Sequence, residues 1–170
     1  IYNGTSPSDP NGKPSTVEPT GTSTSIITTS DGYRWKYMYT IPVAQVLKFF
    51  SADYMPVFSD ASVTSNAVAG EIDTVIITSS GSGYNNGTYD NVAIAGDGTG
   101  GRVSIVVDGG RVISATVTSG GTGYSFGKVT VDAISGIGTG TGGQIDVIIT
   151  PPGAHGKDPE VEVGAYRVMV

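Results

Sequence analysis

The sequence predicts an all-β, mainly antiparallel protein with one short helix, whose sandwich- or barrel-like body is built from two tandem β repeats. Three observations predict this class. Glycine is abundant, at 26 of 170 residues, while only 14% of the residues are charged, a composition typical of β proteins with tight turns. Apolar and polar residues alternate in several short segments. One segment also repeats another at a nearly constant offset.

Residues 1–25 are predicted to form an extended polar arm. Of these residues, 17 are Gly, Pro, Ser or Thr, which leaves too few apolar side chains to build a core. We expect such an arm to gain order by lying along a neighbour within a larger assembly.

Residues 26–70 are predicted to form an aromatic hairpin and a short helix. The run SIITTSDGYRWKYMYTIP contains two strand-like stretches separated by the turn signal Asp31-Gly32. A period of two places four aromatic side chains on one strand face, predicted to be a core or interface face: Tyr33, Trp35, Tyr37 and Tyr39. The following run VAQVLKFF, residues 43–50, has its apolar residues at the spacing of one helical face. We expect this helix, or a partner protein, to cover the aromatic face.

Residues 71–110 and 111–153 are predicted to be two copies of one β unit. They align at an offset of 40, which becomes 42 after the two-residue insertion Thr141-Gly142. Each copy reads as a strand, a glycine turn ending in Tyr, a short strand, a glycine loop and an alternating strand, and each is expected to bury its apolar face against the other. The side chains expected in the interior are Val103, Ile105, Val107, Ile145, Val147 and Ile149. Residues 154–170 are predicted to form a loop and a terminal strand.

Several motifs that could carry chemistry are predicted to be structural. Residues 138–143 match a dinucleotide fingerprint, but a strand follows where pyrophosphate needs a helix. Asp97 lies in a stretch like a calcium-binding glycine repeat that occurs only once, and His155 lies in a loop without a nucleophile motif. The acidic residues that a hydrolase would need in a pair are scattered: Asp73, Asp90, Asp97 and Asp132. We therefore expect no enzyme activity, no cofactor and no metal site.

Tyr84 and Tyr124, which end the two glycine turns, allow two interpretations. The preceding glycines permit close backbone approach, so each ring can pack over its own turn. Alternatively, both rings could stack on glycans. Packing is the interpretation that we favour.

The charge and hydropathy of the chain limit its partners. The net charge of −6 gives no broad electrostatic reason to bind nucleic acid. No apolar run is long enough for a membrane span.

The run DGYRWKYMYTIP before a short helix resembles baseplate wedge and related tail structural proteins of contractile-tailed, T-even-like phages, particularly those of marine cyanobacteria. The residues that carry the resemblance are Asp31, Gly32, Tyr33, Trp35, Tyr37, Ile41 and Pro42. The turns GSGY and GTGY and the segment PPGAHGKDPEVEVGAY also resemble segments of phage tail proteins.

The resemblance implies a structural virion protein fragment that mediates protein-protein contacts in a phage tail baseplate. Its implied partners are other tail or baseplate subunits in an oligomeric assembly, and its implied location is the virion, after synthesis in the host cytoplasm. One alternative stays open: a carbohydrate-binding or adhesion module of a phage fibre or bacterial surface protein, exposed outside the cell, that uses Tyr84 and Tyr124.

Overall fold

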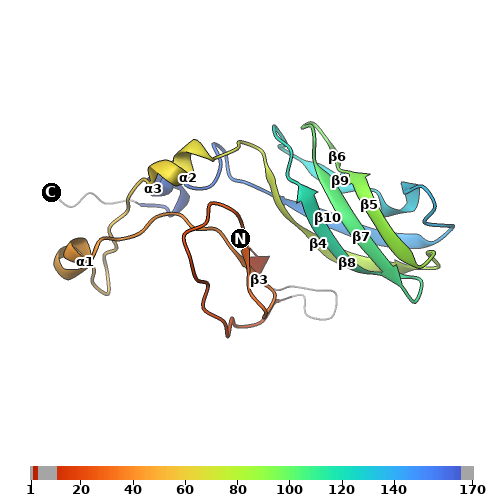
Figure 1. Ribbon diagram of the computed structural model, residues 1–170, viewed down its shortest axis with the longest axis horizontal. Helices are drawn as coiled ribbons and strands as arrows, with labels where there is room; N and C mark the ends of the chain where they lie inside the picture. Colours follow the sequence, from red (N-terminus) through yellow and green to blue (C-terminus); the bar gives the residue numbers. More distant parts are fainter. Residues whose placement is uncertain (1, 4–10, 166–170) are drawn as a thin grey trace.

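The computed structural model describes residues 2–3 and 11–165. The molecule is elongated, with a β body at one end and helices, loops and a small sheet at the other (Figure 1). The elements in chain order are β1 (Tyr2–Asn3), β2 (Ile27–Thr28), β3 (Tyr33–Trp35), α1 (Val43–Phe49), α2 (Ala61–Ser65), β4 (Ile72–Ser82), β5 (Gly87–Ala93), β6 (Ala95–Gly96), β7 (Arg102–Asp108), β8 (Arg111–Ser119), β9 (Gly127–Val129), the 3-10 turn η1 (Val131–Ala133), β10 (Thr141–Ile149) and α3 (Pro159–Glu162).

The β body consists of two sheets with strand orders β4-β10-β9-β6 and β5-β7-β8. Every pairing within them is antiparallel. The predicted all-β, mainly antiparallel class is therefore confirmed, and among the described residues the strands form separate sheets and not a closed barrel.

Each repeat completes the sheet of the other. The first strand of the first repeat, β4, pairs with the last strand of the second repeat, β10, and β8 pairs with β7 in the reciprocal way. The two registers correspond under the predicted offsets: Ile72 faces Ile149 and Ile77 faces Ile145 in one pair, and Val112 faces Val107 and Val117 faces Val103 in the other. The strand pairing thus follows the offsets of the predicted duplication.

The core lies between the two sheets and draws on both repeats. Of the six side chains expected in the interior, Val103, Ile105, Val107 and Ile145 are fully buried, while Val147 and Ile149 are partly buried and pack against the same cluster. Burying alternate residues of a strand leaves the intervening ones on the outer face. The alternation read from the sequence therefore identified the correct face.

A small sheet of order β1-β3-β2 stands apart from the body. Its β2-β3 hairpin confirms the turn predicted at Asp31-Gly32, and Ile27 faces Trp35 across it. The strand predicted to continue through Tyr39 ends at Trp35. It ends there because β1 and β2 are two residues long and offer no partner beyond this point.

The helical elements differ in part from the prediction. The predicted helix forms as α1, and two further short helices, α2 and α3, were not predicted. α3 lies where the sequence predicts a terminal strand, and it begins with Pro159 in its first turn and with the Asp158 carboxylate accepting a hydrogen bond from Val161 N–H. Both are helix-start signals that outweigh the alternating apolar pattern. Residues 166–170 of the predicted strand, and residues 1 and 4–10 of the predicted arm, lie outside the described residues.

Candidate protein-protein interface

Tyr33 and Trp35 share one face of β3, as the period of two predicts. Their rings stack with centroids 5.4 Å apart and planes inclined by 21°. The Trp35 indole N–H donates to Thr29 Oγ1 at 3.2 Å. Both side chains are half-buried. The pair therefore packs on the surface of the hairpin and does not form a fully buried core.

Asp31 fastens the described part of the arm to this hairpin. Its carboxylate accepts hydrogen bonds from Thr29 Oγ1 at 2.5 Å, from Ser15 Oγ at 2.7 Å and from Thr16 N–H at 2.8 Å. These bonds, those from Thr29 and Ser15 first, hold the pKa of Asp31 well below its usual range. The neighbour that orders residues 15–17 is therefore the hairpin of the same chain.

Tyr37 and Tyr39 lie beyond β3 and link the hairpin to α2. The Tyr37 hydroxyl donates to Asp60 Oδ2 at 3.0 Å, and the same carboxylate caps α2. Hydrogen bonds from Ser62 and then from Tyr37 lower the pKa of Asp60. Tyr39 meets Phe58 edge to face, with centroids 6.3 Å apart. The expected single strand face of four aromatics is therefore wrong beyond Trp35, because local partners hold the last two rings.

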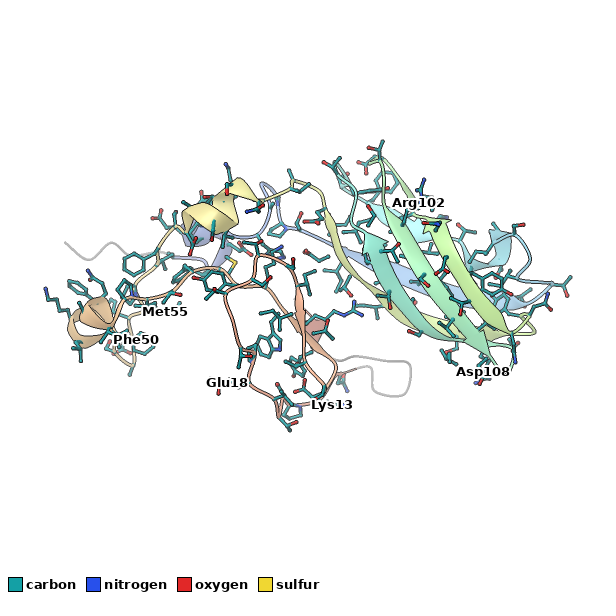
Figure 2. All side chains as sticks on the ribbon, viewed as in Figure 1. Lys13, Glu18, Phe50, Met55, Arg102 and Asp108 are labelled. Atoms are coloured by element: carbon teal, nitrogen blue, oxygen red, sulfur yellow. The ribbon has the colours of Figure 1, made fainter. Side chains whose placement is uncertain are left out.

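The helix expected to cover the aromatic face turns its own apolar face to solvent. No residue of α1 is buried, and Val43 is 75% exposed, Leu47 82% and Phe50 52%. The neighbouring large apolar side chains are also exposed: Val46, Phe49, Tyr54 and Met55. We call residues 43–55 the apolar segment. Figure 2 shows its Phe50 and Met55 at the end of the molecule away from the β body.

Such a concentration of exposed apolar side chains is the surface chemistry of a protein-protein contact. Scattered exposed hydrophobic residues are normal in soluble proteins, but these seven fall within thirteen consecutive residues. The segment has no paired carboxylates or other catalytic grouping in its sequence. The segment is suited to binding a partner protein by burying its apolar side chains against it.

Tyr84 and Tyr124 are buried in the body, each with only 4% of its surface exposed. Tyr84 fills a socket made by the glycine loop of the second repeat, where Gly143 N–H donates to its hydroxyl at 2.7 Å. Tyr124 fills the corresponding loop of the first repeat, where Gly101 N–H donates at 3.1 Å. A glycan cannot reach rings in this position, so the stacking alternative fails for both. Each ring fills the other repeat's loop, and the Tyr84 ring also lies against Gly81 of its own turn.

The remaining candidate residues hold the fold together. Residues 138–143 line the Tyr84 socket and lead into β10, without the helix that a nucleotide would need. Asp97 accepts hydrogen bonds from Ser125 Oγ, Ser125 N–H and Phe126 N–H, and these bonds, the Ser125 hydroxyl first, lower its pKa to about 2. Asp90 accepts from Ser104 Oγ, and Asp132 accepts from the Tyr84 hydroxyl.

His155, in the loop before α3, connects two elements, β4 and α3, that the sequence analysis did not bring together. Its Nε2 lies 2.9 Å from Oδ2 of the buried Asp73 in β4, and its Nδ1 contacts Glu162 Oε1 in α3. Glu162 also accepts from Gly156 N–H at 2.7 Å. The one sequence signal for this group was Asp73 itself, a charged residue within an otherwise uncharged strand pattern.

Comparison with known proteins connects this architecture to a family. A family model described as bacteriophage T4 Gp8 matches residues 2–94, more than half of the chain. The chain belongs to the Gp8 family. Gp8 is a structural protein of the T4 baseplate, so this chain is a structural baseplate protein of a T4-like phage and its place is the virion tail. No curated protein and no solved structure matches the chain.

The Gp8 match covers the candidate interface completely. It includes the aromatic hairpin, the apolar segment, α2, β4 and β5, and it ends at Ile94. As a baseplate protein, a Gp8-family chain works by contact with other baseplate subunits. No helix in the described part of the chain is long and apolar enough to cross a membrane.

Proposed function

We propose that this chain is held in the baseplate by its apolar segment, residues 43–55, which buries its exposed side chains against another baseplate subunit. The observation that carries the proposal is the exposure of Val43 and Leu47, at 75% and 82%, on a helix with no buried residue. Full burial of one such side chain contributes about 1.5 to 3 kcal/mol. Several together supply the energy of a specific contact.

The β body serves in this proposal as a rigid support for the apolar segment. We further propose that the chain acts within an oligomeric assembly and without a catalytic role. The engagement of Asp73, Asp90, Asp97 and Asp132 in structural contacts supports the absence of catalysis. The same proposal places the chain in the wedge of the baseplate and gives it a cyanophage origin. It also includes synthesis in the host cytoplasm and the absence of nucleic-acid binding.

The test is incorporation of variants into tails. Leu47→Asp places a charge in the centre of the apolar segment and is expected to lower incorporation at least about tenfold. Ile113→Asp makes the same chemical change at a side chain that is 58% exposed on β8 of the body and is expected to assemble normally. The measurement is the amount of each variant in tails from cells infected by a phage lacking the gene. Normal incorporation of both variants would contradict the proposal.

A further inference from the structure

Helix α1 lacks the features that stabilise a short helix by itself. It has seven residues, its N-cap is Pro42 without a side-chain cap, and its first turn contains no acidic residue. Lys48 in the last turn is its one favourable end charge. Isolated helices shorter than about 12 residues are marginal in water. Since no residue of α1 is buried, the rest of the described chain supplies little packing energy to compensate.

The side chains of α1 have the pattern of a helix that fits into a groove. Val43, Val46, Leu47 and Phe50 follow the spacing i, i+3, i+4 and i+7, which places them on one face. Gln45 lies on the opposite face, together with Ala44 and Lys48. The anchors therefore line up only when the segment is helical, since an extended chain would send Val46 and Leu47 to opposite sides.

The large hollows described on this chain do not suit these anchors. One, of about 580 Å³, lies between the small sheet and the body, and polar or small side chains predominate in its lining, among them Arg34, Lys36 and Glu71. The other, of about 560 Å³, lies beside β5. Its large apolar side chains, Tyr89, Val92 and Ile134, already pack against the core of the body, and polar side chains such as Asp90 and Asn91 share the lining. Four large apolar anchors need an apolar groove, which indicates a receptor other than this chain.

We infer that α1 docks as an amphipathic helix into an apolar groove of a different baseplate subunit, and that it becomes stably helical only when docked. This inference rests on the proposed function of the apolar segment and adds the shape and chemistry of the partner surface. Order gained on binding lowers the affinity that the contact area alone would give. Changes in helix propensity on the solvent face of α1 therefore alter the affinity.

The experiment compares Gln45→Ala with Gln45→Gly in the full chain. Both variants remove the same side chain from the face opposite the anchors, and they differ by about 1 kcal/mol in helix propensity. Each is titrated against the other baseplate proteins of the same phage, purified one at a time, and against itself. We expect one baseplate protein to bind Gln45→Ala at least as tightly as the unchanged chain and Gln45→Gly about fivefold more weakly. We also expect hydrogen exchange at residues 46–50 to slow markedly only in that complex.

The possible results separate this inference from the proposed function. Equal affinities for the alanine and glycine variants, with binding abolished in Leu47→Asp, would overturn the helical docking and leave the apolar segment as the contact. Unchanged binding of Leu47→Asp would overturn both. Self-association that depends on Leu47, without binding to another baseplate protein, would overturn the choice of a different subunit.

Discussion

Glycine is required at particular positions in the β body because the rings of Tyr84 and Tyr124 leave no room for a Cβ there. A Cβ built on Gly140 would lie 2.3 Å from Tyr84 Cδ1, and one built on Gly98 would lie 2.5 Å from Tyr124 Cδ2. Neither position can give way easily, because the backbone nitrogen of the same tyrosine is 2.6 Å away in each case. Burial, and next the hydrogen bond to Asp132, raises the pKa of Tyr84, so this ring enters its socket with a protonated hydroxyl.

Gly140→Ala and Gly98→Ala are expected to destabilise the protein by similar amounts, about 2 to 3 kcal/mol each, because each overpacks one of two equivalent sockets. Gly109→Ala is the control. Its Cβ would meet nothing within 4 Å, so only the positive φ of 57° is penalised, at about 1 kcal/mol. Urea denaturation of the three variants measures these losses. A socket variant that is no less stable than the control would contradict this account.

At the level of elements, the sequence correctly predicted the features that depend on the local pattern of apolar residues. The alternation in β7 and β10 and the helical spacing in α1 are properties of neighbouring residues, and the structure has both. The exchange of strands between repeats could not be predicted, because a strand pattern does not specify its partner. For the same reason the sequence could not place Tyr84 in the other repeat's loop, although it correctly favoured packing for that residue.

The candidate interface was predicted only in part. The aromatic residues drew attention to the correct region, but their local partners, Thr29 and Asp60, are invisible in a period-two pattern. The helical spacing of residues 43–50 predicted an apolar face without indicating whether that face is covered. Exposure is a tertiary property, so only the structure could identify the apolar segment.

The contact of Asp73, His155 and Glu162, which we call the histidine clasp, ties β4 to α3 and is expected to depend on pH. Burial alone lowers the pKa of His155, but hydrogen bonds to Asp73 and Glu162 outweigh it and raise the pKa above its ordinary value of 6.5. Protonated His155 therefore stabilises the folded state. This contribution to the free energy of unfolding is complete below pH 6.5 and is lost as the pH rises through the pKa of His155 in the folded protein.

His155→Gln is therefore expected to lose stability relative to the unchanged chain at about pH 6, with a smaller difference at each higher pH. Urea denaturation across this range provides the stability difference. Hydrogen exchange of residues 150–165 should show the same trend locally. Lys157→Gln, which removes an exposed charge two residues away, is the control and should show no such trend. A difference for His155→Gln that stays constant or grows with pH would contradict the clasp.

At the level of the whole molecule, the two repeats are expected to unfold together. Tyr124 belongs to the second repeat but fills the loop of the first. Tyr124→Ala should therefore lower the free energy of unfolding by about 3 to 5 kcal/mol and destabilise both repeats together. Hydrogen exchange should accelerate at residues 94–103 as well as at residues near position 124. Phe126→Ala removes a nearby ring that is 62% exposed and should leave both regions protected. Faster exchange confined to residues 111–153 would show that the repeats are independent.

The chain enters the β body through β4 and leaves it through β10, and these two strands are antiparallel neighbours joined at Ile72 and Ile149. A pull on the helical end of the molecule therefore draws both strands in the same direction, so the hydrogen bonds between them are not sheared. The tension passes onward to β9, and through the bond from Ile72 N–H to the Gly120 carbonyl it reaches the second sheet. The body is therefore connected to the helical end of the molecule through two hydrogen-bonded strands and not through one edge strand.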